Sequence, residues 1–361
     1  MEKAFPQNNK PVIVFDISSS HRGGPYIACK NLSNSPLKHE FTFKEITYST
    51  KLGRFISWRR IKDLKRQIKS LNPDGIIITG LQLSCFHVIV AALLAGVKTR
   101  IITIHGSSTE ALSLSKLKKS LLYLIEFFSL WMCTSFYGVS KYASTLSAAN
   151  LFKKKNRGYV YNLPTEKRHC HDTLRREDLG FNDTDIIIIS SGRIVKEKGY
   201  EVLANAIQEI NHPKIKFIIL GDGDYLSQMK EKLSKEIADG RVNCPGFCEN
   251  VYNYLNIADI FILPTLHETL SISLLEAAQA GLPLISCNVG GVPEVIENGV
   301  NGILVEPNDI KALAEAINTL AQNPIIRNTM GKHSSELIKT KFSQNKSINR
   351  LKDIIINDLK Q

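Results

Sequence analysis

Short runs of β-branched residues alternate with longer helical stretches along the chain, and this alternation limits the possible folds more than any other feature. Runs such as IIIIS at 186–190 and FIILG at 217–221 are apolar on both faces. Strands of a parallel sheet that is covered by helices on each side have this character. The pattern therefore predicts an α/β fold built from doubly wound parallel sheets. The expected strands are 12–17, 75–79, 100–104, 136–139, 159–161, 186–190, 215–220, 242–244, 260–263, 283–286 and 302–305.

The length of 361 residues favours two domains, at roughly 100 to 200 residues per domain. We expect an N-terminal domain at 1–163, a polar linker at 164–182, a C-terminal domain at 183–340 and a helix at 341–361 that crosses back to the first domain. Two such domains would face each other across a cleft. Because doubly wound sheets bind ligands beyond the carboxyl ends of their strands, function is expected in those loops.

Basic residues are concentrated in the first domain. Residues 1–163 hold 24 Lys and Arg against 8 Asp and Glu, a net charge of +16, whereas the remaining residues carry a net charge of −4. This asymmetry indicates an anionic partner, either nucleic acid or a membrane surface, although a merely soluble basic surface gives the same count. The seven cysteines form no C-x-x-C pair and the first ten residues lack a signal-peptide core, so we expect a reduced, cytoplasmic protein.

Two glutamates stand where the strand 260–263 passes into a helix. Glu268 lies at the turn, and Glu276 follows eight residues later inside the helix. A helix start presents unpaired amides and a partial positive charge, which suit a phosphate or an array of sugar hydroxyls. Glu268 can accept sugar hydroxyls, and Glu276 can accept the two hydroxyls of a ribose. Acidic residues are also favoured at helix starts for structural reasons alone.

Two cations and a glycine follow the neighbouring strands of the second domain. Arg193 and Lys198 lie in one loop after the strand 186–190 and can close together on a diphosphate. Gly221 follows the strand 215–220 and lets the backbone approach a ligand closely. An ordinary solvated loop and a simple turn would explain each of them separately.

Polar loops also follow two strands of the first domain. Gly23 and Gly24 end the segment SSSHRGG and can form an anion-facing loop, although the spacing is not that of a dinucleotide fingerprint. His105 follows the strand 100–104 and places an imidazole at the carboxyl edge of the sheet. A single histidine at a strand end is more often structural.

The order and spacing of these segments resemble those of the retaining glycosyltransferases of family 4, which have the GT-B fold. The segments are GRIVKEKG, GDGD, PGF, PTLHE with a second glutamate eight residues on, and GGVPEVIENGVNGILV. In the first half the resemblance rests on SSSHRGGP, ITIHG and GVS. It implies two Rossmann-like domains and transfer of a sugar from a nucleoside diphosphate, expected to be UDP, in the assembly of a polysaccharide, lipopolysaccharide or glycolipid.

The resemblance also implies roles for the individual residues. Glu268 and His105 would act catalytically at the donor sugar, and Glu276 would bind the ribose. The other donor-binding positions would be Arg193 and Lys198 at the diphosphate, Gly23 and Gly24 at the phosphate and acceptor, and Gly221, Thr269, Leu270 and Ser271 nearby.

One departure from the family pattern follows Glu268. The family usually has Gly-Phe-Gly at this point, whereas this chain has Thr269, Leu270 and Ser271. Side chains replace two glycines near the donor sugar, so the resemblance does not name the sugar.

No metal and no other cofactor is expected. The two cations and the helix-start amides can offset the charge of a leaving diphosphate themselves. The cluster of His169, Cys170, His171 and Asp172 could ligate a metal, but no second cluster at zinc spacing accompanies it.

Two basic, amphipathic segments contribute much of the positive charge: KLGRFISWRRIKDLKRQIKSL at 51–71 and SKLKKSLLYLIEFFSLW at 115–131. The second is too short to span a bilayer and fits a helix that lies on an anionic lipid surface. The structural alternative for both is a core-facing helix with a solvated basic face. With the family resemblance, the segments lead us to expect a peripheral protein on the inner face of the cytoplasmic membrane, with a lipid-linked glycan or lipid as acceptor.

Two other functions stay open at this point. A GT-B nucleotide-sugar epimerase would share the donor site. A non-catalytic basic module for nucleic acid would explain the charge, but the sequence shows no helix-turn-helix, zinc module or aromatic-interleaved basic strand.

Overall fold

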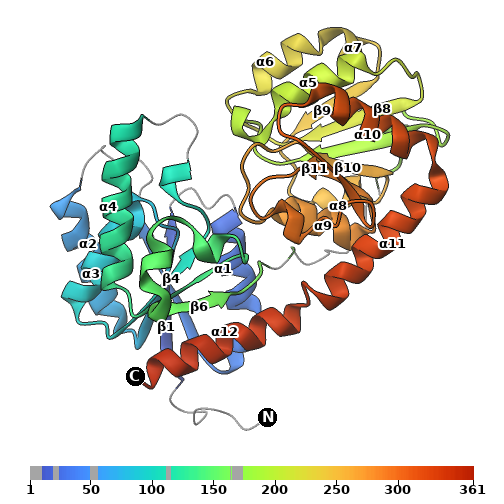
Figure 1. The fold of residues 1–361 in the computed structure, drawn as a ribbon. Helices are drawn as coiled ribbons and strands as arrows, with labels where there is room; N and C mark the ends of the chain where they lie inside the picture. The colour runs from blue at the N-terminus through green and yellow to red at the C-terminus, as the bar shows by residue number, and fades with distance from the viewer. Residues whose placement is uncertain (1–9, 19–23, 49–55, 111–114, 163, 165–173) are drawn as a thin grey trace. The chain divides into compact units, whose positions relative to one another are not determined.

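The computed structural model describes residues 10–18, 24–48, 56–110, 115–162, 164 and 174–361 (Figure 1). The chain divides into two compact units, Met1–Leu163 together with Ser343–Gln361, and Pro164–Phe342. They are called the N-unit and the C-unit below.

A parallel six-stranded sheet forms the centre of the N-unit, in the order β2-β1-β3-β4-β5-β6. Its strands are β1 (Val12–Ser18), β2 (Thr42–Tyr48), β3 (Gly75–Thr79), β4 (Thr99–Ile104), β5 (Ser135–Gly138) and β6 (Asn156–Tyr159). Its helices are α1 (Gly24–Asn34), η1 (Pro36–His39), α2 (Trp58–Leu71), α3 (Leu83–Ala95), η2 (Ser108–Glu110), α4 (Lys116–Met132), η3 (Ala143–Thr145), η4 (Ser147–Lys155) and α12 (Gln344–Leu359), where η marks a 3-10 helix.

The C-unit repeats this plan with the order β12-β11-β10-β7-β8-β9. Its strands are β7 (Ile186–Ser191), β8 (Ile215–Leu220), β9 (Val242–Gly246), β10 (Ile260–Leu263), β11 (Leu284–Cys287) and β12 (Gly302–Val305). Its helices are η5 (Glu177–Leu179), η6 (Lys196–Lys198), α5 (Tyr200–Glu209), α6 (Leu226–Lys232), α7 (Ser234–Ala238), α8 (Val251–Leu255), α9 (Ile272–Ala280), η7 (Val292–Glu294), α10 (Ile310–Gln322) and α11 (Pro324–Thr340). The predicted α/β fold with two doubly wound sheets is confirmed.

The inner strands match the prediction best because both of their faces are buried. All four residues of β10 are buried, and so are Ile187, Ile188 and Ile189 of β7. Strand β2 is absent from the predicted strands, and β6 runs from Asn156 to Tyr159, whereas the predicted strand lies at 159–161. Both are edge strands of the N-unit sheet. Edge strands tolerate polar side chains, so TFKEITY and NRGY carry no continuous apolar run.

The second half of the predicted linker is packed onto the C-unit. Phe181 is buried, and Arg176 pairs with Asp259 at 3.1 Å between its Nη2 and Oδ2. Arg176 also donates to the carbonyl oxygen of Asp185 at 2.9 Å. Residues 174–182 are therefore packed against the C-unit directly before β7, although their polar sequence is typical of a linker.

Helix α12 is part of the N-unit and is anchored by a buried carboxylate near its end. The side chain of Asp358 is fully buried, and its Oδ1 lies 2.8 Å from Nη2 of Arg157 in β6. It also accepts a hydrogen bond from Ser135 of β5. Ile355 and Leu351 pack into the same core as Phe15 of β1. A polar anchor of this kind fixes the position of α12 along the sheet, which apolar contacts alone would define less strictly.

Asp16 is a second buried carboxyl group, located where β1 and β3 lie side by side in the N-unit. Its Oδ1 accepts from the backbone N–H of Thr79 at 2.6 Å, and its Oδ2 accepts from the hydroxyl of Tyr48 at 3.3 Å. Burial raises the pKa of Asp16 from 3.8 to about 7, against the opposing effect of these hydrogen bonds. The hydrogen bond from Thr79 to Asp16 therefore fixes the end of β3. The free-energy cost of burying the ionised carboxylate grows as the pH rises.

We predict that Asp16→Asn removes a pH-dependent loss of stability. Between pH 4 and 7 the folded protein keeps a proton on Asp16 that the unfolded chain has released, so wild-type stability falls as the pH rises through this window. At about 1.4 kcal/mol per pKa unit, the wild type should lose a few kcal/mol relative to the variant. Thermal unfolding of both proteins from pH 4 to 8 measures this difference. Parallel pH profiles for the two proteins would contradict it.

Candidate functional site

The order in which the chain adds strands to the C-unit sheet reverses between β7 and β10, at the centre of the sheet. Strands β7 and β10 are neighbours; β8 and β9 follow on one side, and β11 and β12 follow on the other. The loops after β7 and β10 therefore lie at the topological switch point of this sheet, beyond the carboxyl ends of its strands, where doubly wound sheets bind ligands. Arg193 and Lys198 lie in the first loop, and Glu268 lies in the second.

The loop 192–199 is clamped between the loops that follow β8 and β10. A Cβ on Gly221, whose φ is +139°, would lie 1.8 Å from the carbonyl oxygen of Gly192. A Cβ on Gly199, whose φ is +71°, would lie 1.7 Å from the carbonyl oxygen of Pro264. Both positions need glycine for conformation and for space. The predicted residue Gly221 thus shapes the site through backbone packing.

Backbone hydrogen bonds close the same three loops on one another. The N–H of Ile194 donates to the carbonyl of Asp222, and the N–H of Leu266 donates to the carbonyl of Glu197, each at 2.9 Å. Glu197 and Gly199 are not among the site residues predicted from the sequence. A glycine directly before α5 was the available signal for Gly199, whereas the backbone contact of Glu197 leaves no signal in the sequence.

Lys198 and Glu268, from the loops after β7 and β10, contact each other directly. The ammonium group of Lys198 forms an ion pair with Oε2 of Glu268, and the two side chains are 23% and 10% exposed. Oε1 of Glu268 accepts from the N–H of Thr269 at 3.2 Å, and its carbonyl oxygen accepts from the N–H of Gly291 at 2.9 Å. Arg193, in the same loop as Lys198, is exposed. One carboxylate that is held in place and two cations of different accessibility therefore lie in these two neighbouring loops.

Helix α9 begins three residues after Thr269. Ser271 is its N-cap residue, and its hydroxyl accepts from the N–H of Leu274 at 3.3 Å. Thr269, Leu270 and Ser271, which the sequence analysis placed near the donor sugar, are all buried. Their side chains are therefore buried in the protein, and the turn leads directly into the first turn of α9, whose amides give the helix start a partial positive charge.

Glu276 lies on α9 and is 8% exposed. Burial, and secondarily the charge of Glu276, raise the pKa of Tyr252 in α8. Tyr252 donates a hydrogen bond to Gln279, one turn beyond Glu276. The carboxylate therefore lies beside a buried phenol, in a position set by the packing of α8 on α9.

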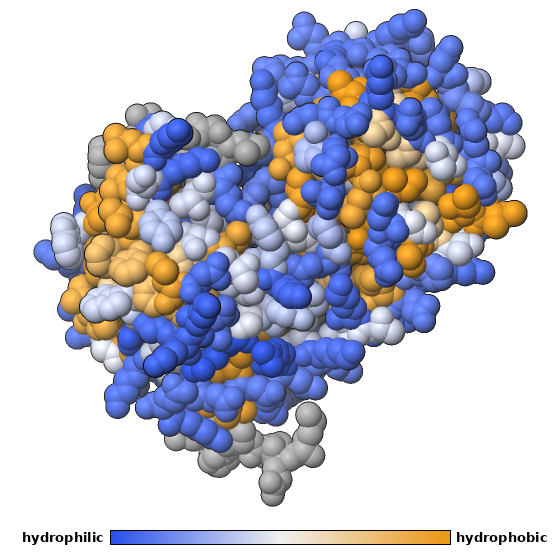
Figure 2. Space-filling view, in the orientation of Figure 1, coloured by the Kyte–Doolittle hydropathy of each residue, from blue (hydrophilic) through white to orange (hydrophobic). Residues whose placement is uncertain are grey.

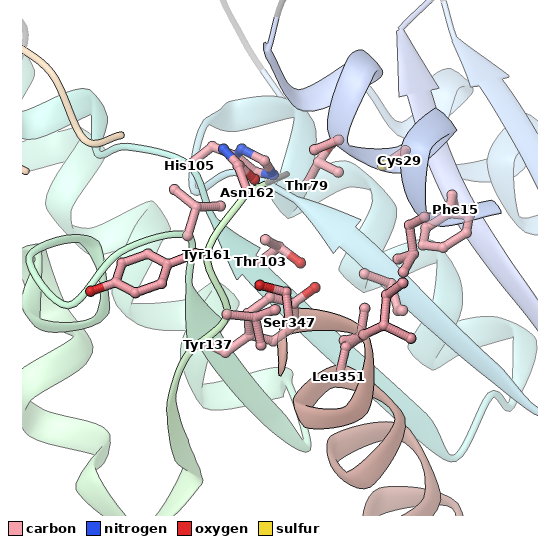
Figure 3. A pocket seen from close by; sticks show the side chains of 16 residues that line it. Phe15, Cys29, Thr79, Thr103, His105, Tyr137, Tyr161, Asn162, Ser347 and Leu351 are labelled. Atoms are coloured by element: carbon pink, nitrogen blue, oxygen red, sulfur yellow. The ribbon is translucent and has the colours of Figure 1, made fainter. Parts of the chain in front are cut away.

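In the N-unit, His105 follows β4 and lines a cavity of about 50 Å³ (Figure 3). His105 and Asn162 lie together at one end of this cavity, and Ser347 and Leu351 of α12 lie at the other. Burial lowers the pKa of His105 from 6.5 to about 4, so its imidazole is neutral near pH 7. A cavity of this volume has room for a few water molecules. Gly24 is the first residue of α1, and Gly23 lies outside the described residues.

Two acidic residues follow β8, where the sequence analysis stressed only glycine. Asp222 and Asp224 stand two residues apart, and Asp222 accepts from the N–H of Gly223 at 2.8 Å. Within the described ranges no group of three or more His, Cys, Asp and Glu side chains is arranged to hold a metal ion. The cluster His169–Asp172 lies outside those ranges.

Comparison with known proteins shows that the C-unit is similar to one enzyme family. Residues 172–337 match the family model described as "Glycosyl transferases group 1". The chain is 31% identical over 159 residues to the 2-deoxystreptamine N-acetyl-D-glucosaminyltransferase of Niallia circulans, covering 43% of this chain and 41% of that protein. It is 25% identical over 278 residues to the UDP-Gal:alpha-D-GlcNAc-diphosphoundecaprenol alpha-1,3-galactosyltransferase of Escherichia coli, covering 74% and 71%. Several of the curated relatives are matched over about half of their length.

The fold is also similar to that of solved structures. The crystal structure of HepE from Anabaena in complex with UDP-glucose superposes with a TM-score of 0.79 at 17% identity, covering 96% of this chain and 99% of that one. At this identity the likeness concerns the fold, which is GT-B.

We predict that Arg193→Ala and Lys198→Ala each weaken the binding of UDP, used as a nucleoside diphosphate probe. Each variant removes a cation that can bond to phosphate, and a hydrogen bond to a charged group is worth about 1.5 to 3 kcal/mol. Calorimetry should therefore show affinities roughly 10- to 100-fold lower. Lys196→Ala is the matched control, because Lys196 is an exposed cation of the same loop. Unchanged affinities for both site variants would remove this loop from the binding site.

Proposed function

Because residues 172–337 carry the group 1 glycosyltransferase domain, we propose that this chain is a retaining, metal-independent glycosyltransferase that moves a sugar from UDP to a lipid-linked glycan or lipid. The observation that carries the proposal is the pairing of Lys198 with Glu268 at the switch point of the C-unit sheet. It puts a cation for the diphosphate and a carboxylate for the sugar within one hydrogen bond of each other.

The donor would be held by charge on one side and hydrogen bonds on the other. Arg193 offers a planar set of donors to the diphosphate, and Lys198 offers a point charge. The amides at the start of α9 add a partial positive charge, and buried Glu276 accepts the ribose hydroxyls. These groups stabilise the charge that develops on UDP as it leaves, so the proposed reaction needs no divalent metal.

Transfer would then proceed on one face of the sugar. The bond between the anomeric carbon and the phosphate oxygen breaks, the acceptor oxygen bonds to the same face of that carbon, and the acceptor proton passes to the leaving phosphate. Glu268 and His105 orient the sugar, and neither becomes glycosylated. A neutral His105 fits this role, because one imidazole nitrogen donates a hydrogen bond and the other accepts one.

We predict that an α-linked UDP-sugar yields an α-linked product and that EDTA leaves the rate unchanged. The anomeric proton in the NMR spectrum of the product reports the configuration, and the release of UDP with and without EDTA reports the need for metal. A β-linked product would contradict retention. Loss of activity in EDTA that magnesium restores would contradict metal independence, and would direct attention to Asp222 and Asp224.

Helix α4 of the N-unit supports the proposed membrane-linked acceptor. Its apolar residues at spacings of four and three form an exposed stripe, which Figure 2 shows as orange side chains over α4. The residues of this α4 stripe are Leu117, Leu121, Leu124, Phe128 and Trp131. Lys116, Lys118 and Lys119 stand at the start of the helix. An apolar stripe beside a basic end suits a helix that lies on anionic lipid.

Helix α2 behaves differently from α4. Its residues Ile61, Leu64 and Ile68 are at most 1% exposed, which supports a core-facing helix, whereas Trp58 at its start is 66% exposed. Its basic side chains can add electrostatic attraction without inserting into lipid. None of the helices in the described ranges has the length and apolar content needed to cross a membrane.

We predict that the protein sediments with vesicles containing anionic lipid and that salt weakens this binding, since exposed charges are screened within about 10 Å at 0.1 M. Replacing Leu121 and Leu124 together by Glu should reduce the bound fraction, because two apolar contacts become charges. The control is Ile325→Glu on α11, where an exposed apolar residue of the C-unit changes in the same way. Equal binding to neutral vesicles, or an equal loss in the control, would contradict the proposed surface.

A further inference from the structure

Helix α4 has a buried carboxylate on the side opposite its exposed stripe. Glu126 lies two residues after Leu124 and two before Phe128, which places it about half a turn away from both. It is 0% exposed, whereas Phe128 is 48% exposed. Among the helix residues around it, from Leu121 to Trp131, Glu126 is the one charged side chain. The cost of burying a carboxylate indicates that it does something an apolar residue at this position could not do.

Glu126 accepts hydrogen bonds from two separate loops. The hydroxyl of Ser107 lies 3.0 Å from Oε1 and 2.8 Å from Oε2, and the hydroxyl of Ser147 donates to Oε2. Ser107 is in turn 2.5 Å from the hydroxyl of Thr109, whose backbone N–H lies 3.1 Å from the Ser107 oxygen. One carboxylate therefore fixes the segment after β4 and the start of η4 to the body of α4.

The second of these loops is held in an uncommon conformation. Ser147 has a φ of +52°, in the left-handed region that non-glycine residues seldom adopt. Its hydrogen bond to Glu126 helps to maintain that conformation. At the other end of η4, the ammonium group of Lys155 donates to the carbonyl oxygens of Leu130, Trp131 and Cys133 at 3.2, 2.6 and 2.8 Å, which caps the end of α4. Both ends of η4 are thus tied to α4.

The first loop is the one that carries His105. Ser107 follows His105 by two residues, and β4 fixes the chain on the other side at Ile104. With Ile104 held in the sheet and Ser107 held by Glu126, the backbone of His105 is anchored from both directions. We propose that Glu126 is a positioning residue, which sets the orientation of His105 by tying its loop to α4. This inference rests on the proposed role of His105 at the donor sugar.

A carboxylate suits this task better than the other side chains of similar size. Its two oxygens only accept, so two hydroxyl donors from two loops can share them without competing for a proton. Glutamine keeps one accepting oxygen and so preserves part of the arrangement. Leucine fills the space but leaves both hydroxyls without this acceptor.

The test compares Glu126→Gln, Glu126→Leu and the control Leu130→Ala. Leu130 lies one turn further along the same buried face, and its truncation weakens the packing of α4 while keeping the carboxylate. Hydrogen exchange measured by mass spectrometry should show amides 106–110 exchanging about tenfold faster in Glu126→Leu, as expected for the loss of an anchoring hydrogen bond, and little faster in Glu126→Gln. Unchanged exchange in this segment, or an equal increase in Leu130→Ala, would overturn the inference. Ser107→Ala gives the same comparison if Glu126→Leu does not fold.

Kinetics with UDP-glucose or UDP-galactose and a lipid-linked acceptor extract provide the second readout. The inference expects Glu126→Leu to lower kcat at least tenfold with the KM for the donor unchanged, and Glu126→Gln to restore most of the rate. A raised donor KM with unchanged kcat would contradict it, because His105 would then be correctly oriented without Glu126. If the wild type transfers no sugar while the exchange pattern is as expected, the proposed function fails and the anchoring of the loop by Glu126 stands.

Discussion

The close backbone packing of three loops is the constraint on which the C-unit site depends. Gly199 and Gly221 allow the segment 192–199 to lie against Pro264 on one side and Gly192 to lie against the loop after β8 on the other, at separations that no side chain could occupy. Lys198 is therefore presented by a stretch of backbone that has little freedom to move. The ion pair with Glu268 follows from this packing, because each partner stands on a loop that the other loop holds in place.

The charged residues of this site combine rigidity with access. Glu268 is largely buried and held through its carboxylate, its carbonyl oxygen and the ion pair, whereas Arg193 is exposed on the same loop as Lys198. A fixed carboxylate suits the orientation of a neutral sugar, and an exposed guanidinium suits the capture of a diphosphate from solution. The turn 269–271 carries side chains where the resembling family has glycines. These side chains are buried.

In the N-unit, buried carboxyl groups tie loops and elements to the sheet. Asp16 holds the end of β3, Asp358 holds α12, and Glu126 holds the segment after β4 and the start of η4. In each case the acceptors are oxygens within the protein interior and the donors belong to neighbouring segments. Helix α4 is thus fixed from inside by polar contacts, which leaves its opposite apolar stripe available to a lipid surface in the proposed function.

The sequence by itself determined the α/β class and the inner strands, because buried parallel strands need continuous apolar runs. It also determined the order of the site segments, because each of them follows a predicted strand. It also pointed to Lys198 and Glu268 as members of one site, although they stand 70 residues apart. It did not find the edge strands β2 and β6, whose exposure permits polar residues, nor the packed state of 174–182. Only the tertiary structure decided that Lys198 pairs with Glu268 and that Glu126 anchors the loop of His105. It also decided that Ile61, Leu64 and Ile68 of α2 are buried, whereas the α4 stripe is exposed. Each of these depends on which segments distant in sequence lie against one another, and local periodicity carries no record of such contacts.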